Sequence, residues 1–218
     1  MLNFVEMSQE SLDVLKKSMS RISAAIITYN EEKNIERCIS SLVNVADEIV
    51  VIDSGSEDKT REIALKLGAK VIINKFEGHI QQKNFAITQT SNEWIISLDA
   101  DEALSNELNK SIVKIKRKLE GDGYKFNRLT NYCGKWIKHC GWYPDTKLRL
   151  FKKGKGSWRG KNPHDKYILD SGKEIYLNGD ILHYTFYEVS EHKAQIKKFS
   201  EISAQSLFEL NKKSNWTI

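Results

Sequence analysis

The chain has 218 residues, of which 40% are hydrophobic and 29% are charged, and its formal net charge is +5 at pH 7. These values fit a soluble globular protein that forms one domain with a sizeable core. No apolar stretch approaches the ~20 residues of a membrane span, and the N-terminal segment lacks the pattern of a secretory signal. The three cysteines show no metal-ligand spacing and favour a reducing, cytoplasmic compartment.

Residues 21–120 alternate between short apolar runs and one-sided helical patterns. Gly68 stands just after one of these helical patterns, where a C′ glycine is common. In chain order we predict a strand at 21–28, a helix at 32–43, a strand at 48–52, a helix at 58–67, a strand at 71–73, a helix at 78–88, a strand at 94–98 and a long helix from Leu104 to Leu119. This alternation predicts an α/β fold with a parallel sheet between helices.

The pattern changes after residue 120. Strands of alternating polarity, typical of an exposed sheet face, are predicted at 124–129 and 147–151, and an aromatic segment lies between them. A lysine-bearing helix is predicted at 190–213. We therefore expect an N-terminal extension at 1–20, a single domain at 21–189 and a basic amphipathic helix at 190–218.

Carboxylates follow three of the predicted strands. Glu31 follows the strand at 21–28, Asp53 ends the strand at 48–52, and Asp99 and Asp101 follow the strand at 94–98. In an open α/β sheet the carboxyl ends of the strands form the ligand crevice, so these acids should share one edge. Oxygen ligands suit Mg²⁺ or Mn²⁺, and such an ion bridges to phosphate. The sequence therefore predicts a site for a divalent cation and a phosphorylated ligand.

These acids also have simpler interpretations. Asp99 and Asp101 could cap the helix that follows them, and the turn after Asp53 could likewise only cap a helix. The sequence has neither GxGxxG nor GxxxxGKS/T, so the fingerprints of dinucleotide-binding and P-loop proteins are missing.

Two histidines carry open alternatives. His164 and Asp165 follow an Asn-Pro pair and could supply a general base, or they could belong to an ordinary turn with an exposed histidine. His183 ends an apolar run, where a core histidine is a more common finding than a ligand.

Basic residues concentrate between positions 147 and 166, where eight Lys and Arg residues accompany a single acid, Asp165. The stretch is either a solvated loop or a surface for an anionic partner, such as a phosphorylated acceptor or an acidic membrane face. No nucleic-acid-binding motif is present, so we expect no nucleic-acid partner.

Taken in order, the motifs resemble family 2 glycosyltransferases of the GT-A fold. The first half carries Thr28-Tyr29-Asn30-Glu31, Asp53-Ser54-Gly55-Ser56 with Asp58, Gln82-Lys83-Asn84, and Leu98-Asp99-Ala100-Asp101-Glu102. The second half is similar to the bacterial lipopolysaccharide core β-glucosyltransferase branch through Tyr143-Pro144-Asp145, Leu148-Arg149-Leu150-Phe151, Pro163-His164-Asp165 and His183-Tyr184. The resemblance runs from about Ile22 to about Phe199. Asp165 stands where the branch usually has a glutamate.

The resemblance implies a Rossmann-like, mostly parallel sheet flanked by helices. Residues 21–120 would be the nucleotide-binding half, and residues 121–189 a mixed α+β acceptor half. The implied nucleotide-sugar-binding residues are Thr28, Tyr29, Asn30, Glu31, Asp53, Lys83, Asp99 and Ala100. Asp101 and His183 are the implied ligands of Mn²⁺ or Mg²⁺, and Asp165 is the implied catalytic base. We expect acceptor or phosphate contacts from Trp142, Arg149, Arg159 and His164.

The implied activity is inverting, metal-dependent transfer of a sugar, expected to be glucose, from a UDP-sugar. The expected acceptor is a hydroxyl of an anionic cell-surface glycolipid or oligosaccharide, such as the lipopolysaccharide core. This acceptor implies a cytoplasmic enzyme with a peripheral contact to the inner membrane. The alternatives are a nucleotidyltransferase on a similar sheet and an inactive sugar-binding or membrane-binding module. The first would need a glycine-rich first loop, and the second does not explain why both acids of the Asp-x-Asp motif are present.

Overall fold

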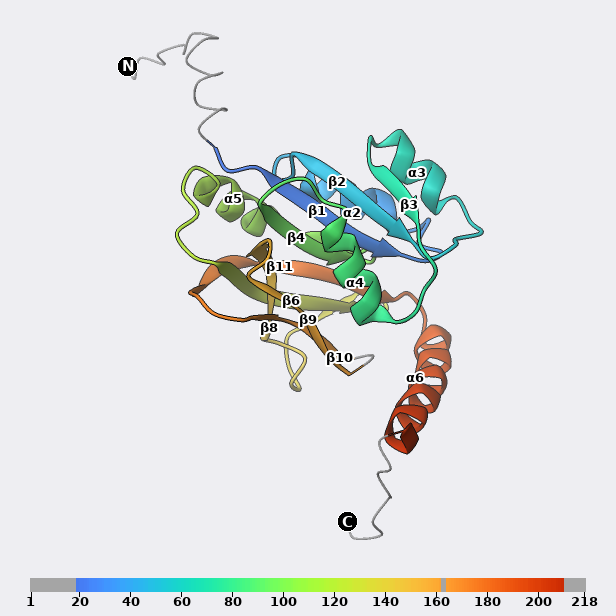
Figure 1. Ribbon diagram of the computed structural model, residues 1–218. Helices are drawn as coiled ribbons and strands as arrows, with labels where there is room; N and C mark the ends of the chain where they lie inside the picture. Colours follow the sequence, from blue (N-terminus) through green and yellow to red (C-terminus); the bar gives the residue numbers. More distant parts are fainter. Residues whose placement is uncertain (1–18, 162–163, 210–218) are drawn as a thin grey trace, which may run out of the picture.

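The computed structural model describes residues 19–161 and 164–209. Residues 1–18 of the predicted extension at 1–20 therefore lie outside the described residues, as do residues 210–218 of the predicted C-terminal segment. Within these ranges the chain forms a nine-stranded sheet, a separate two-stranded hairpin and five helices, which lie on both sheet faces or project from the sheet (Figure 1). None of the described helices is long and apolar enough to cross a bilayer.

The first half of the sheet is parallel. Its strands lie in the order β3-β2-β1-β4, so the chain crosses over between neighbours through helices. The strands are β1 (Ile22–Thr28), β2 (Glu48–Asp53), β3 (Lys70–Ile73) and β4 (Trp94–Asp99), and the helices are α2 (Ile35–Leu42), α3 (Thr60–Lys66), α4 (His79–Thr88) and α5 (Asn106–Ile115). All four strands and all four helices begin or end within a few residues of the predicted positions. Gly68, with φ of 80°, follows α3 as the sequence predicts.

Every residue of β1 is buried, because helices or the hairpin cover both faces of the sheet. Ala24 and Ile26 belong to the core beneath α2 and α5, whereas Ala25 and Ile27 belong to the core beneath α4. Successive residues of a strand point to opposite faces, which explains why an uninterrupted apolar run forms this strand.

The second half continues the same sheet with mainly antiparallel pairs. β8 pairs with both β4 and β6, and β11 pairs parallel with β6 and antiparallel with β5. The strands are β5 (Glu102–Leu104), β6 (Gly123–Tyr132), β7 (Lys135–Ile137), β8 (Asp145–Lys152) and β11 (Glu174–Phe186). A hairpin of β9 (Gly156–Lys161) and β10 (His164–Leu169) packs near α4, and α6 (Val189–Glu209) extends away from the body of the protein (Figure 1).

Three expectations from the sequence are wrong in detail. Leu104 belongs to the short strand β5 rather than to a helix, because Ser105 caps α5 by accepting a hydrogen bond from the Leu108 amide. The strands at 124–129 and 147–151 lie inside the sheet, with Phe126 and Leu150 fully buried, instead of presenting an exposed face. Strands β5, β7, β9, β10 and β11 are additional to the strands that the sequence predicts.

Candidate functional site

The ends of β1, β2 and β4 meet at one edge of the sheet, as the sequence predicts. Thr28 pairs in register with Asp53, and Ile27 pairs with Asp99. Glu31 and Asp101 both line a cavity at this edge. Parallel pairing therefore brings together carboxylates that are far apart in the sequence.

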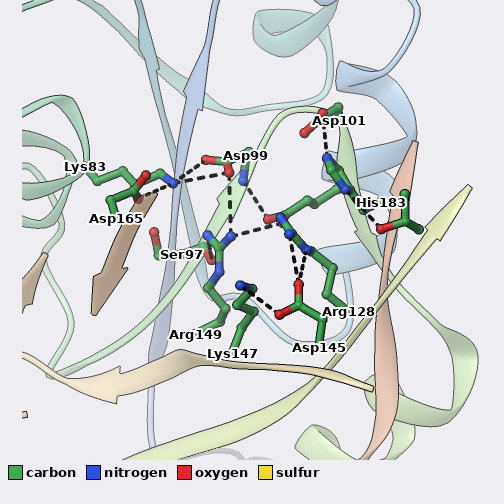
Figure 2. A network of polar contacts seen from close by, with 12 residues as sticks. Lys83, Ser97, Asp99, Asp101, Arg128, Asp145, Lys147, Arg149, Asp165 and His183 are labelled. Atoms are coloured by element: carbon green, nitrogen blue, oxygen red, sulfur yellow. Dashed lines mark hydrogen bonds and ion pairs between the residues drawn. The ribbon is translucent and has the colours of Figure 1, made fainter. Parts of the chain in front are cut away.

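A chain of alternating charges runs inward from this edge (Figure 2). Lys83 on α4 lies between two carboxylates, with its Nζ 2.8 Å from Asp165 Oδ2 and 3.1 Å from Asp99 Oδ1. Arg149 on β8 lies 3.6 Å from Asp99 and 3.0 Å from Glu102. Burial opposes ionisation of Asp99, but Lys83 and Arg149 together hold the pKa of that carboxyl well below its usual range. Asp99 is therefore an anion held by two buried cations.

The chain of charges continues across the sheet from Glu102. Arg128 on β6 lies 3.7 Å from Glu102 and 2.9 Å from Asp145, and Lys147 lies 2.8 Å from Asp145 (Figure 2). Burial opposes ionisation of Asp145, but its contacts with Lys147 and Arg128 lower its pKa. Each buried charge thus has a partner of opposite sign, which offsets the cost of removing it from water.

Glu102 also shapes the turn that carries the two predicted aspartates. Its Oε2 atom accepts a hydrogen bond from the Asp99 amide at 3.0 Å. On the opposite side of the turn, the Ala100 amide donates to the Ile27 carbonyl at 3.2 Å. These two bonds fix the direction in which Asp99 and Asp101 leave β4. Ala100 itself is buried.

Asp101 and His183 meet at the cavity edge, with His183 Nε2 3.1 Å from Asp101 Oδ2 (Figure 2). The other ring nitrogen lies 3.5 Å from the Thr130 hydroxyl. Burial lowers the pKa of His183, but the neighbouring Asp101 carboxylate outweighs it and raises that pKa overall. His183 is therefore buried, as a core histidine would be, but its ring also contacts the carboxylate of Asp101.

The chemistry of this pair fits a divalent cation. One carboxylate oxygen and one imidazole nitrogen form a mixed set that Mn²⁺ accepts readily. The described part of the chain contains no group of three or more His, Cys, Asp or Glu residues arranged to hold a metal. The remaining coordination positions would therefore fall to a bound phosphate or to water, as is common for hard cations at phosphate sites.

A cavity of about 340 Å³ opens beside Asp101, between the β1–α2 loop and the start of α6. The charged residues that line it are mainly acidic, and Lys33 is the basic residue among them. The acidic lining residues are Glu31, Glu32, Asp58, Asp101 and Glu191. Burial, reinforced by the charge of Asp101, raises the pKa of Glu31 to about 7. An anionic ligand would enter such a cavity only with a cation, because the like charges repel.

Asp53 is fully buried and organises the loops at the edge. Its carboxylate accepts hydrogen bonds from the amides of Gly55 at 3.0 Å and Ser56 at 2.9 Å, and also from the Ser56 hydroxyl. That hydroxyl in turn accepts from the Asn30 amide at 2.8 Å. Asp53 thus connects the end of β2 to the end of β1. A direct contact between Asp53 and a nucleotide stays a prediction.

The other predicted residues of the first loop differ in exposure. Tyr29 is exposed, whereas Thr28 is buried and its hydroxyl has no hydrogen-bond partner among the described residues. Asn30 has φ of 53° and accepts a hydrogen bond from the Glu57 amide through its side chain. Asparagine tolerates this left-handed conformation better than most residues, so the loop can turn sharply at the strand end.

The β9–β10 hairpin brings Asp165 to the site, and α4 holds this hairpin in place. Asn84 donates to the Trp158 carbonyl at 3.0 Å and accepts from the Trp158 amide at 2.9 Å. Lys83 Nζ lies 4.5 Å from the centre of a Trp158 ring, and the Arg149 guanidinium lies 5.1 Å from it. The sequence contained Asn84 within a recognised motif, but neither its partner nor the role of Trp158 was predictable.

The four predicted acceptor or phosphate contacts are found in different surroundings. Trp142 is exposed and packs edge-on against Tyr132. Arg149 is buried and paired with Glu102 and Asp99, which argues against its predicted acceptor contact because its guanidinium already serves two carboxylates. Arg159 pairs with Asp170 on the exposed hairpin. The side chain of His164, like residues 162–163, lies outside the described part.

The basic stretch is less positive than its sequence indicates, because acids from other segments pair with it. Lys152 lies 2.8 Å from Glu93, and Lys155 lies 3.7 Å from Asp122. Lys153 donates to the Thr90 carbonyl at 2.6 Å. Most of the stretch forms strands β8 and β9 rather than the solvated loop that was one of the two expectations.

Comparisons with known proteins identify the family of the chain. Residues 23–167 match the family described as glycosyl transferase family 2. An uncharacterized glycosyltransferase of Rickettsia typhi is 35% identical over 206 residues, which cover 89% of this chain and 70% of that protein. The lipopolysaccharide core biosynthesis glycosyltransferase LpsC of Rhizobium meliloti is 28% identical over 204 residues, covering 88% of this chain and 73% of that protein.

Among solved structures, residues 1–349 of S. aureus TarS align with a TM-score of 0.47 and 20% identity, covering 61% of this chain and 47% of that chain. The extent of the family match and the identity to the Rickettsia typhi relative are sufficient to place the protein. The chain belongs to glycosyl transferase family 2.

Proposed function

We propose that the protein is an inverting, metal-dependent glycosyltransferase that moves a sugar from a UDP-sugar to a hydroxyl of an anionic glycolipid. The observation that carries the proposal is the convergence of Asp165, Lys83 and Asp99 with the Asp101–His183 pair at one sheet edge. Inverting transfer needs a base for the acceptor and positive charge for the leaving diphosphate. Both requirements can be assigned to residues at this edge.

Asp165 is the proposed base. In the reaction, the acceptor oxygen would form a bond to the anomeric carbon, the bond from that carbon to the diphosphate would break, and the acceptor proton would pass to the carboxylate. Lys83 holds Asp165 through Oδ2 at 2.8 Å, which orients the other oxygen for the acceptor. The side chain of Asp165 is largely buried, so a bound acceptor would displace little water there.

Asp101 and His183 would hold Mn²⁺ or Mg²⁺. The bound ion would supply Lewis-acid stabilisation of the leaving diphosphate. The acidic cavity supports this assignment, since a UDP-sugar is itself an anion and needs a cation to enter beside Glu31 and Asp101. Glu31, Asn30 and Thr28 would line the nucleotide side, with Asp53 behind them.

Aromatic side chains beside the cavity are the proposed acceptor surface. Trp136 and Trp142 are both exposed, and Trp136 packs edge-on against Tyr184, which lines the cavity. Sugar rings have apolar faces that can pack on aromatic side chains. The likeness to LpsC, named for lipopolysaccharide core biosynthesis, supports a core oligosaccharide as the acceptor class. Glucose is the donor sugar that we propose to test first.

A peripheral contact with an anionic membrane would bring the protein to such an acceptor. Helix α6, which projects from the body of the protein (Figure 1), supports this part of the proposal. Ile196, Leu207 and Phe208 are exposed along it, and Lys193 and Lys197 are exposed near Ile196. Exposed apolar side chains with lysines nearby are typical of helices that lie on a bilayer surface.

Release of UDP from UDP-glucose in the presence of Mn²⁺ tests the proposed base. Asp165→Asn keeps the size of the side chain but removes its basicity, so kcat should fall by roughly 10²–10⁴ while the donor KM changes little. Asp170→Asn, on the same hairpin and paired with exposed Arg159, is the matched control and should keep its activity. Chelation of the metal should abolish turnover, and added Mn²⁺ should restore it. An Asp165→Asn protein as active as the wild type would reduce Asp165 to an ion-pair residue.

A further inference from the structure

The segment that joins β11 to α6 is hydrogen-bonded to the start of helix α2 beside the acidic cavity. The Tyr187 hydroxyl donates to Asn34 Oδ1 and accepts from the Arg37 guanidinium at 2.8 Å. Arg37 also donates to the same Asn34 oxygen, and its guanidinium carbon lies 3.4 Å from the centre of the Tyr184 ring. Tyr184 and Tyr187 line the cavity from the second half of the chain, and Asn34 lines it from the first half.

The backbone of this segment is held independently of the tyrosine side chain. The Glu191 carboxylate accepts hydrogen bonds from the amides of Tyr187 at 2.7 Å and Glu188 at 3.2 Å. Such a bond from the first turn of a helix back to the residues before it fixes the entry of the chain into the helix. The loss of the Tyr187 hydroxyl alone should therefore leave the path of the backbone unchanged.

Asn34 transmits the contact to Glu31. Its Nδ2 atom donates to Glu31 Oε2 at 2.7 Å, while its Oδ1 atom accepts from Tyr187 and Arg37. An amide offers donors on one side and an acceptor on the other, so the two donors at Oδ1 determine that the NH₂ group faces the carboxylate. The reverse orientation would place an oxygen against Glu31 and the NH₂ group against two donors. Asn34 is 6% exposed, and water therefore does little to compensate such a mismatch.

We propose that Tyr187 and Arg37 are positioning residues that act through Asn34 to hold the Glu31 carboxylate in the donor cavity. The inference rests on the proposed function, in which Glu31 lines the nucleotide side of the donor cavity. The binding of the donor by the β1–α2 loop then depends on the segment between β11 and α6. The hydrogen bond from Tyr187 to Asn34 joins residues that are 153 positions apart. The cavity is complete only when both segments are in place.

Calorimetric titration of UDP in the presence of Mn²⁺ tests this inference. Tyr187→Phe removes one hydroxyl and keeps the ring, whose centre lies 5.8 Å from Lys33 Nζ. We expect the UDP Kd and the donor KM to rise about five- to tenfold, the usual consequence of losing one hydrogen bond, with kcat and the unfolding temperature nearly unchanged. The matched control is Tyr176→Phe on strand β11, whose hydroxyl accepts from Asn127 at 2.8 Å outside the cavity, and its UDP Kd should equal that of the wild type.

A double-mutant cycle with Glu31→Ala shows whether Tyr187 acts through Glu31. If it does, Tyr187→Phe should weaken UDP binding in the wild-type background and have almost no further effect once Glu31 is absent. Fully additive effects would mean that Tyr187 contacts the nucleotide directly, and would overturn the inference. A lower unfolding temperature with an unchanged UDP Kd would also overturn it, since the role would be purely structural. If the wild-type protein binds no UDP, the proposed function fails together with this inference; if it binds UDP and Tyr187→Phe binds equally well, the inference alone fails.

Discussion

Glu102 is the residue that connects the turn of the Asp-x-Asp motif to the buried charges of the sheet. It is 1% exposed, lies 3.0 Å from Arg149, and accepts from the Asp99 amide at 3.0 Å. A buried carboxylate without partners would be strongly destabilising, so Arg149 is required as long as Glu102 and Asp99 remain ionised. This explains why Arg149 lies inside the protein rather than on an acceptor surface.

Replacing Arg149 should therefore reduce stability. Arg149→Met removes the nearer of the two cations beside Glu102 and one of the two cations beside Asp99. We expect a loss of about 3 kcal/mol in the free energy of unfolding, measured by urea denaturation. Lys152→Met is the control on the same strand, because its ion pair with Glu93 is exposed and its loss should change stability little. Equal, small losses in both variants would show that the Arg149 charge is not needed for folding.

The raised pKa of Glu31 predicts a pH dependence of stability. In the folded protein this pKa is about 7, against a reference value of 4.5, so between these pH values the folded state binds the proton more tightly than the unfolded state. The resulting stabilisation is complete below about pH 4.5 and is lost as the pH rises through about 7. At ~1.4 kcal/mol per pH unit, the change is on the order of 3 kcal/mol.

Glu31→Gln should remove this part of the pH profile, because a glutamine does not titrate. The measurement is the free energy of unfolding of metal-free protein between pH 5 and pH 8, and the two proteins should differ in slope across this interval. Parallel profiles for the two proteins would exclude Glu31 as the group responsible.

At the scale of elements, the contact between α4 and the β9–β10 hairpin decides where Asp165 lies. Lys83 binds the Asp165 carboxylate, and the next residue, Asn84, makes two hydrogen bonds to the backbone of Trp158. One helix thus fixes both the side chain of the proposed base and the strand beside it. Because Trp158 pairs with Tyr167 in the antiparallel β9–β10 hairpin, fixing β9 also fixes β10, which carries Asp165.

Loss of the Asn84 contacts should reduce catalysis more than donor binding. Asn84→Ala frees β9 from α4, and we expect kcat for UDP release to fall about tenfold with a nearly constant donor KM, because small displacements of a base are costly. Asn84→Asp keeps the acceptor for the Trp158 amide and should recover part of the activity. Thr88→Ala, an exposed position on the same helix, is the control. A rise in donor KM without a change in kcat would show that Asn84 serves the donor site instead.

At the scale of the whole molecule, the two predicted halves share one sheet. The parallel strands of residues 21–120 continue into the second half through the antiparallel pair of β4 and β8. The predicted α/β fold of GT-A type and the predicted family are confirmed. The sheet is more mixed than expected, however, because antiparallel pairs join β4, β8 and β6.

The projection of α6 from this body predicts how the protein meets a membrane. Leu207→Ser together with Phe208→Ser should weaken sedimentation with vesicles that contain anionic lipid, because both side chains are exposed apolar groups. Lys152→Gln should have a smaller effect, since that lysine is paired with Glu93. Equal binding by the wild type and the double variant would remove α6 from the proposed membrane contact.

The sequence alone determined the strands and helices of the first half, the sheet edge that gathers Glu31, Asp53, Asp99 and Asp101, and the family. These follow from local patterns, because a buried strand needs a continuous apolar run and a parallel sheet collects its strand ends at one edge. Tertiary structure alone decided that Arg149 is buried, that Lys83 lies between Asp99 and Asp165, and that Tyr187 reaches Asn34. The partners in these contacts are 16 to 153 positions apart. A local pattern of polarity or spacing does not indicate which charged or polar groups will come into contact when distant segments pack together in one sheet.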